Sequence, residues 1–265
     1  MSGLQFMHLQ SFSRKANGGG QSVQQVLDET ERKPEYCEHV DGPQPPVVVY
    51  GIGVDEVRSL HDDMVEKGGV KVTLKSGRQV RRGIRKDRHT LMTAVASHPL
   101  PTKLVKSDDA ARKAYENWRG LNLKWLKSLF GDRLVSVIEH WDEQHPHIHA
   151  YILPLDDPSC SARRLNPAWQ SKEEAMEKAR AAGNNDKAAL KLGNAAYRAT
   201  AREMQDDYYE NVSIPSSLTR TEPKRERLSR GQWKARKEQA RRDAKLHNDI
   251  SSRVERIVDA EIDLE

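Results

Sequence analysis

The chain has 265 residues, of which 36% are hydrophobic and 31% are charged, and its formal net charge is +5. This length suits one large domain, or one domain with an appendage. The composition excludes a membrane-embedded chain, because no apolar run approaches the roughly 20 residues that a bilayer-spanning helix needs, while the basic balance permits a nucleic-acid partner.

The compartment is indicated by cysteine usage and by the N-terminal sequence. Only two cysteines are present, Cys37 and Cys160. Two cysteines make no disulfide framework, which is typical of a reducing compartment. The first residues contain no apolar core of a secretory signal. We therefore expect a cytoplasmic protein.

The predicted elements alternate between helices and strands. Residues 1–20 are polar and end in three glycines, which predicts a flexible N-terminus. Periodicity and turn residues then predict helices and strands in this order: helix 21–32, strand 46–51, helix 54–67, hairpin strands 70–74 and 78–83, strand 88–97, helix 108–130, and a strand pair around 134–153. Strands that come largely as antiparallel pairs with helices between them indicate an α+β fold, one sheet covered by helices.

The composition changes after residue 156. Residues 169–210 are rich in Ala, Glu, Lys and Arg and predict two helices divided near residue 184. Residues 213–232 are polar and basic, and an amphipathic helix is expected from 231 to about 261. We therefore expect a flexible segment 1–20, a main domain 21–220, and a basic linker with a C-terminal amphipathic helix, 221–265. That helix can form a homodimer or contact a partner protein.

Positive charge is concentrated in two segments. Residues 75–88 carry seven Lys and Arg against one acid, and residues 220–245 carry eleven against four. In the first segment the basic residues follow a hairpin strand, where arginines on one face can bind a nucleic-acid backbone. The alternative is an edge strand whose charges prevent aggregation. The candidate DNA-binding residues here are Arg78, Arg81, Arg82, Arg85 and Lys86.

The histidine-rich stretch from residue 139 to residue 151 carries the chemistry. His147 and His149 lie on one face of a predicted strand, because side chains alternate along a strand. A strand, a short loop and a returning strand would bring His140 opposite them. Three imidazoles converging on one point suit a divalent metal with open coordination positions. Asp142 and Glu143, in the connecting loop, can complete the ligand shell or act as a base.

This stretch resembles the signature of the Mob/Pre family of plasmid mobilisation relaxases and recombination enzymes, which belong to the wider class of HUH endonucleases. The matching positions are His140, Asp142, Glu143, Pro146, His147 and His149. Segments 84–87, 164–167 and 204–212 are similar to further family segments, so the resemblance covers roughly residues 20–220.

The resemblance implies an antiparallel, ferredoxin-like HUH sheet covered by helices, with a helical C-terminal extension in this chain. It implies binding of an origin of transfer in single-stranded or extruded DNA, nicking of one strand, and a covalent link to the 5′ phosphate. His140, His147 and His149 would then hold Mn²⁺ or Mg²⁺, with Glu143 as ligand, base or orienting group and Asp142 behind the ligands. Proteins of the transfer machinery would be further partners.

The attacking group departs from the family pattern. The family's first motif places a nucleophile three residues before an arginine; here Arg32 matches, and we expect it to contact DNA, but the nucleophile position holds Glu29. Tyr36 and His39 lie just downstream. Tyr36 is the preferred candidate nucleophile over His39, because a tyrosyl link to DNA is common in the wider class. The alternative is that Tyr36 only packs and His39 only bonds the proline-rich turn.

Three functions therefore stay open. The first is a metal-dependent strand transferase that starts plasmid or mobile-element transfer, which the intact histidine set favours. The second is a relaxase-like DNA-binding or regulatory protein without a competent nucleophile, which the altered first motif favours. The third is an initiator of rolling-circle replication or transposition built on the same core.

Overall fold

A five-stranded antiparallel sheet lies at the centre of the computed structural model, which describes residues 3–16, 20–37, 40 and 42–220. These residues belong to one compact unit, 1–221. In sheet order the strands are β1 (Met7–Ser13), β5 (His89–Ser97), β7 (His147–Ile152), β6 (Leu134–His140) and β2 (Val47–Gly51). Every neighbouring pair is antiparallel. The expected α+β fold is confirmed.

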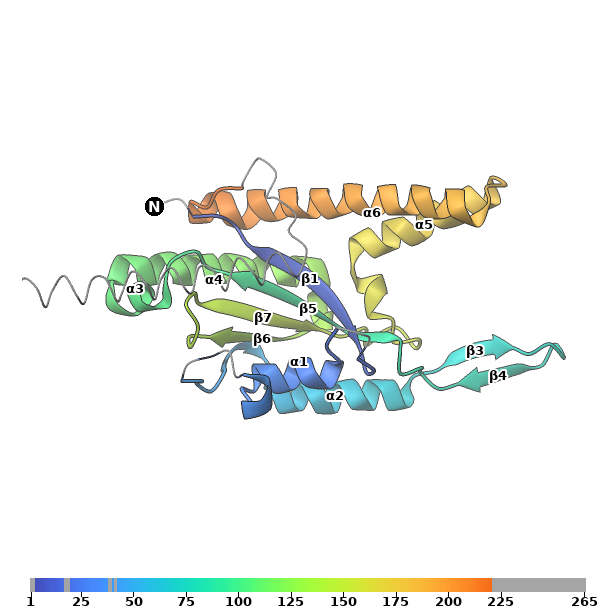
Figure 1. Cartoon of the computed structure of the whole chain (residues 1–265), viewed down its shortest axis with the longest axis horizontal. Helices are drawn as coiled ribbons and strands as arrows, with labels where there is room; N and C mark the ends of the chain where they lie inside the picture. The colour runs from blue at the N-terminus through green and yellow to red at the C-terminus, as the bar shows by residue number, and fades with distance from the viewer. Residues whose placement is uncertain (1–2, 17–19, 38–39, 41, 221–265) are drawn as a thin grey trace, which may run out of the picture. The chain divides into compact units, whose positions relative to one another are not determined.

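Helices cover both faces of the sheet (Figure 1). On one face, α1 (Val23–Thr30) and α2 (Val54–Lys67) pack on a core that includes Leu27, Leu91 and Tyr151. On the other face, α4 (Asp109–Phe130) buries Tyr115 and Trp118 against a second core. The alternation of side chains along β7 explains the division, because Tyr151 faces the first core while Ile148, Ala150 and Ile152 face the second.

Helix ends follow their sequence signals. Ser22 begins α1 with a capping box in which its hydroxyl accepts from the Gln25 N–H. Asp108 caps α4 in the same manner, accepting from the Ala111 N–H, and separates α4 from the short α3 (Thr102–Ser107). Gly131 ends α4 at a φ of 52°, a left-handed conformation that glycine adopts without a Cβ clash.

Two further helices form an antiparallel pair, α5 (Pro167–Ala181) and α6 (Asp186–Tyr208). They approach closely at Gly193, where an added Cβ would lie 2.5 Å from the Met176 side chain. The end of α6 is tied to α4 by the Tyr208 hydroxyl, which donates to Asn122 Oδ1 at 2.9 Å. The prediction of two helices in 169–210 is thus confirmed.

A separate two-stranded sheet consists of β3 (Val70–Thr73) and β4 (Gln79–Arg82). The predicted hairpin is confirmed, with its turn at Gly77, where φ is 79°. It extends away from the five-stranded sheet (Figure 1). We call residues 68–86, which comprise this hairpin and its two connections, the basic arm.

One predicted boundary is wrong. The flexible N-terminus was expected to run to residue 20, yet residues 7–13 form β1, paired along its length with β5. The strand is an edge strand that buries only Met7, Phe12 and Ser13, and four of its seven residues are polar. The predicted C-terminal helix, and the dimer expected from it, lie outside the described residues. Within the described part of the chain, no helix combines the length and apolarity that a membrane crossing requires.

Candidate functional site

The three histidines of the predicted cluster lie on adjacent strands. His140 is the last residue of β6 and is paired with His147, the first residue of β7. His149 is paired with Ile138, two residues earlier on β6. Residues directly opposite each other share a face, so all three side chains point to the face that carries α1 and α2. We call them the histidine cluster.

The rings of the histidine cluster are gathered at one point. Their centroids lie 5.0 Å apart for His147 and His149, and 5.2 Å from His140 to each of the others. A metal about 2.1 Å from one nitrogen of each ring would leave centroids roughly 5 Å apart at near-tetrahedral angles. The His140 and His147 rings are inclined by only 25°. As placed, no group of three or more His, Cys, Asp or Glu side chains among the described residues could hold a metal ion. The spacing of the ring centroids matches that of three metal-bound imidazoles, whereas the positions of the side-chain atoms do not yet form a metal site.

The ring nitrogens of His140 are buried without hydrogen-bond partners in the described part of the chain. Its side chain is buried, and neither ring nitrogen has a hydrogen-bond partner among the described residues. An unpaired buried nitrogen is costly unless something else satisfies it. Burial, followed by the charges of Arg32 and His147, lowers the pKa of His140 to about 3. Burial and the neighbouring rings also hold the pKa of His149 well below its usual range. Both rings are neutral at pH 7, as metal ligation requires.

His147 is oriented by the turn that joins β6 to β7. Its Nδ1 lies 3.1 Å from the His145 carbonyl oxygen, which can only accept, so Nδ1 carries the proton. The other nitrogen, Nε2, lies 3.7 Å from Glu143 Oε1. A ring nitrogen fixed by a backbone carbonyl, with its partner nitrogen free to bind, is the usual arrangement of a metal-binding histidine.

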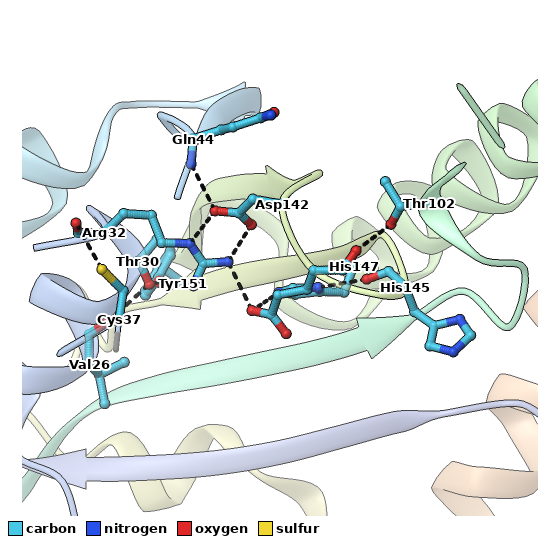
Figure 2. A network of polar contacts seen from close by, with 11 residues as sticks. Val26, Thr30, Arg32, Cys37, Gln44, Thr102, Asp142, His145, His147 and Tyr151 are labelled. Atoms are coloured by element: carbon cyan, nitrogen blue, oxygen red, sulfur yellow. Dashed lines mark hydrogen bonds and ion pairs between the residues drawn. The ribbon is translucent and has the colours of Figure 1, made fainter. Parts of the chain in front are cut away.

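Arg32 holds both acids of the turn (Figure 2). Its Nε and Nη2 donate to the two oxygens of Asp142 at 2.8 and 2.7 Å, and Nη2 also donates to Glu143 Oε1 at 2.9 Å. Burial alone would lower the pKa of Arg32, but its bonds to the two carboxylates outweigh that effect and raise it. Such a bidentate pair fixes geometry as well as charge. Glu143 is thereby positioned beside His147.

The backbone at Arg32 has an uncommon conformation. Arg32 follows the last turn of α1 with a φ of 60°, a left-handed conformation that costs a residue with a Cβ on the order of 1 kcal/mol. The Cys37 thiol donates to the Arg32 carbonyl at 3.2 Å, which helps to hold it. The sequence predicted a DNA contact for Arg32. Instead, its side chain is 5% exposed and bonded to two carboxylates inside the site.

Two supporting contacts had no sequence signal. The Gln44 N–H donates to Asp142 Oδ2 at 3.0 Å, and the Thr102 hydroxyl donates to the Glu143 carbonyl at 2.6 Å (Figure 2). Burial acts to raise the pKa of Asp142. The hydrogen bonds from Arg32 and from the Gln44 N–H outweigh that effect and hold the pKa below its usual range. Both donors come from segments distant in sequence, so only the folded chain brings them to the turn.

The candidate nucleophiles are less closely tied to the histidine cluster. Tyr36 ends a short 3-10 helix, Pro34–Tyr36, and is half-buried. His39 lies outside the described residues. Glu29, at the family's nucleophile position, accepts a hydrogen bond from the Gln21 side chain. Tyr151 is excluded, because its buried hydroxyl bonds Thr30 and burial raises its pKa.

The predicted DNA-binding residues beyond Arg32 lie on or beside the basic arm. The register pairs Lys71 with Arg81 and Val70 with Arg82, so Arg81 and Arg82 point to opposite faces of the hairpin. The expectation that the arginines share one face is therefore wrong, since consecutive residues on a strand alternate. Arg78 lies beyond the turn and is exposed; Arg85 pairs with Asp87 at 2.6 Å. Lys86 is exposed, and its carbonyl accepts from the Lys15 N–H at 3.0 Å.

Solved structures of one relaxase are similar to this chain. One is the Mn-bound crystal structure at pH 6.5 of the MobM relaxase domain, of the MOBV or Mob/Pre class, bound to 23-nucleotide oriT DNA of plasmid pMV158. Its TM-score is 0.45 at 14% sequence identity, over 88% of this chain and 97% of that chain. The same domain bound to 26-nucleotide oriT DNA gives 0.40 at 13% identity, over 67% of this chain and 84% of that one. No family model and no curated protein sequence matches the chain.

Proposed function

We propose that this protein is a metal-dependent DNA relaxase, which nicks one strand at an origin of transfer and remains joined to its 5′ end. The observation that carries the proposal is the histidine cluster, with three rings about 5 Å apart and both nitrogens of buried His140 unpaired. The match of six positions to the Mob/Pre signature supports the same conclusion.

His140, His147 and His149 would hold a divalent cation, Mn²⁺ or Mg²⁺. When bound, the cation supplies positive charge for a non-bridging phosphate oxygen. Neutral imidazole ligands leave that charge undiminished, unlike carboxylates. Asp142 is fully occupied by Arg32 and the Gln44 N–H, so its role is to position the turn.

The chain's own part in the reaction is proton transfer and alignment. A nucleophile forms a bond to phosphorus, the bond from phosphorus to the 3′ oxygen breaks, and that oxygen leaves as a hydroxyl after gaining a proton. The phosphodiester bond is exchanged rather than hydrolysed, so the strand can be rejoined. Glu143 can accept or return a proton, because it lies beside His147 and its side chain is 34% exposed.

The nucleophile is proposed to come from the segment of residues 29–39. Tyr36 is the first candidate, since it lies four residues beyond Arg32, and His39 is the second. A tyrosine would give a tyrosyl phosphodiester and a histidine a phosphoramidate, which differ in acid stability. This difference identifies the nucleophile independently of mutagenesis.

The test is incubation with supercoiled and single-stranded origin DNA in the presence of Mn²⁺, followed by SDS and protease treatment. Nicked DNA carrying a peptide is the expected result, and mass spectrometry of that peptide names the attacking residue. Tyr36→Phe should abolish the adduct if Tyr36 attacks. Absence of nicking with Mn²⁺, Mg²⁺ and other divalent metals, despite DNA binding, would overturn the enzymatic proposal.

A second function has one observation in its favour. At the position of the family's nucleophile, Glu29 is engaged by Gln21 and is not an imidazole or phenol. A DNA-binding or regulatory protein that retains the metal site would follow if no other group attacks. It would bind Mn²⁺ and DNA in the same assays, but would give no DNA-linked peptide.

A further inference from the structure

The residue that precedes β1 at the edge of the sheet, Phe6, exposes an aromatic ring. Its side chain is part of a residue that is 47% exposed. No other Phe, Tyr or Trp residue is exposed in the part of the chain that the structure describes. Single exposed apolar residues are normal on protein surfaces. The functional meaning of Phe6 therefore depends on where its ring lies.

Phe6 lies in the same row of the sheet as the histidine cluster. His147 is paired with His140 on β6 and with Ser97 at the end of β5, whose other end begins at His89, shortly after the basic arm. The Ser97 N–H donates to the Phe6 carbonyl at 3.3 Å. Neighbouring strands lie about 4.8 Å apart, so the backbone of Phe6 is roughly 10 Å from that of His147.

The ring of Phe6 also lies on the face of the sheet that carries the histidine cluster. Met7 belongs to the core on the opposite face, which α4 covers. The side chain of Gln5 points to that opposite face as well, since it donates to Gln205 Oε1 of α6 at 3.2 Å. Phe6 stands between these two residues, and side chains alternate along an extended chain. Its ring therefore points to the face of His147.

Among the described residues, α1 and α2 cover only part of this face. Along β1, Phe6 and Gln10 are exposed, whereas Phe12 is buried in the core that α1 and α2 form with the sheet. On β5, Ser97 is half-buried, whereas Leu91 is completely buried. Exposure on this face thus rises toward the end of the sheet that carries the histidine cluster.

A base of single-stranded nucleic acid fits this surface. An aromatic ring on an open sheet face can stack on an unpaired base of any sequence, because every base has a π face. The other side chains of this open surface, Gln10 and Ser97, are polar. They leave no continuous apolar patch of the kind that a protein partner would cover. A bound single strand needs only isolated points of stacking along its charged backbone.

We propose that Phe6 stacks on a base of the single strand that is cleaved, next to the nucleotide whose phosphate lies at the histidine cluster. The choice of ligand rests on the proposed relaxase function. A base held roughly 10 Å from His147 limits how far the strand can slide across the cluster, so Phe6 would position the reacting phosphate. Because the ring is uncharged, it adds nothing to the salt dependence of binding.

Binding assays without metal test this contact apart from nicking. Two labelled single strands of equal length and charge are titrated in EDTA, one of oligothymidine and one with an abasic site at every position. Phe6→Ala should bind oligothymidine about 5- to 100-fold more weakly than the parent protein, which is the strength of stacking on one base. Its affinity for the abasic strand and its salt slope should not change. Leu192→Ala, at a 50% exposed position of α6, is the matched control and should leave both affinities unchanged.

Two further variants separate stacking from a general apolar contact. Phe6→Trp keeps an aromatic ring and should bind oligothymidine at least as tightly as the parent protein. Phe6→Leu keeps an apolar side chain without a ring and should bind as weakly as Phe6→Ala. The base is located on the origin strand by placing one abasic site at a time. The loss caused by Phe6→Ala should disappear when the abasic site is at one position beside the nick.

Three outcomes would overturn the proposal. One is equal oligothymidine affinity for Phe6→Ala and the control. The second is an equal loss of affinity for the two strands in Phe6→Ala. The third is full affinity in Phe6→Leu, which would make the contact apolar rather than aromatic. Failure of the relaxase function is recognised separately, since the parent protein would then give no nicked DNA with Mn²⁺, whatever Phe6 binds.

Discussion

The regions at the two ends of β5 differ in burial and in charge. At the histidine cluster, the key side chains are largely buried, the rings of His140 and His149 are neutral, and a buried ion pair between Arg32 and Asp142 fixes the neighbouring turn. At the basic arm, exposed cations stand on a small sheet of two strands. The first region depends on side chains held in fixed positions, and the second depends on exposed positive charge.

The contrast explains what each region can do. Reactive groups must be held within a fraction of an ångström, which requires packing and support from neighbouring residues. Binding a polyanion needs only charge at roughly the right spacing, and exposed side chains with freedom of movement supply it. Substitutions should therefore change reaction rate at the first region and affinity at the second.

Removal of a cluster histidine should give the largest effect. His147→Ala and His149→Ala are expected to lower the nicking rate about 10²- to 10³-fold, because a cation contributes several kcal/mol to transition-state stabilisation. Calorimetric titration with Mn²⁺ should lose its high-affinity event in both variants. His8→Ala, at an exposed position on β1, is the matched control and should leave both unchanged. Normal Mn²⁺ binding by both variants would remove the histidine cluster as the metal site.

Breaking the ion pair behind the cluster should come next. Arg32→Gln leaves Asp142, whose side chain is 1% exposed, as an unpaired buried charge. We expect about 3 kcal/mol less unfolding free energy by urea titration, with a 10- to 100-fold slower reaction at unchanged KM.

The double variant Arg32→Gln with Asp142→Asn should cost less than the sum of the two single variants, since the charges are removed together. Arg133→Gln, which breaks an exposed pair with Asp156, serves as control and should cost under about 1 kcal/mol. Strict additivity in the double variant would contradict a coupled pair.

A pH effect of intermediate size is expected from His98, which is buried against Tyr115 and Trp118 of α4. Burial, and then the charge of His145, lower the pKa of His98 to about 4. The unfolded chain takes up this proton below its ordinary pKa near 6.5, so stability is lost as pH falls from there toward 4. Between pH 7 and pH 5, His98 should account for roughly 2 kcal/mol of lost stability. His98→Phe keeps a ring against Trp118. In urea titrations, the loss of unfolding free energy between pH 7 and pH 5 should be smaller by this amount in the variant. An equal loss in the variant and the parent would contradict the assignment to His98.

The smallest effect should come from shortening the basic arm. Joining Lys71 to Arg81 through Asn-Gly keeps their pairing, because Asn-Gly favours a two-residue hairpin turn. The unfolding free energy should change by about 1 kcal/mol or less, since the removed strands pair mainly with each other. A large loss of stability would show that the arm also supports the fold, and would weaken the separation of the two regions.

Sequence alone predicted the strongly patterned parts of this molecule. The helices expected at 54–67 and 108–130 are α2 and α4. The convergence of His140 with His147 and His149 followed from alternation on two adjacent strands. These features rest on local rules, and the fold did not override them.

The parts that sequence could not predict depend on distant partners. Strand β1 is polar at most positions, and only β5 makes it a strand. The contacts of Arg32 to Asp142 and Glu143 join residues about 110 positions apart, which no local pattern encodes. On the arm, the positions of the arginines are plain from the sequence, but the face of the hairpin on which each arginine lies depends on the pairing register.

The first described residues of the chain are joined to the last. Gln5 N–H donates to the Thr219 carbonyl at 3.0 Å, and Thr219 N–H donates to the Gly3 carbonyl at 2.8 Å. During synthesis, these contacts must wait until residue 219 has left the ribosome. At 5–20 residues per second, the N-terminal segment then waits roughly 10 to 40 seconds for that partner. Complete closure of this unit is therefore a late event in translation, and a nascent chain stalled before residue 219 would lack the closure.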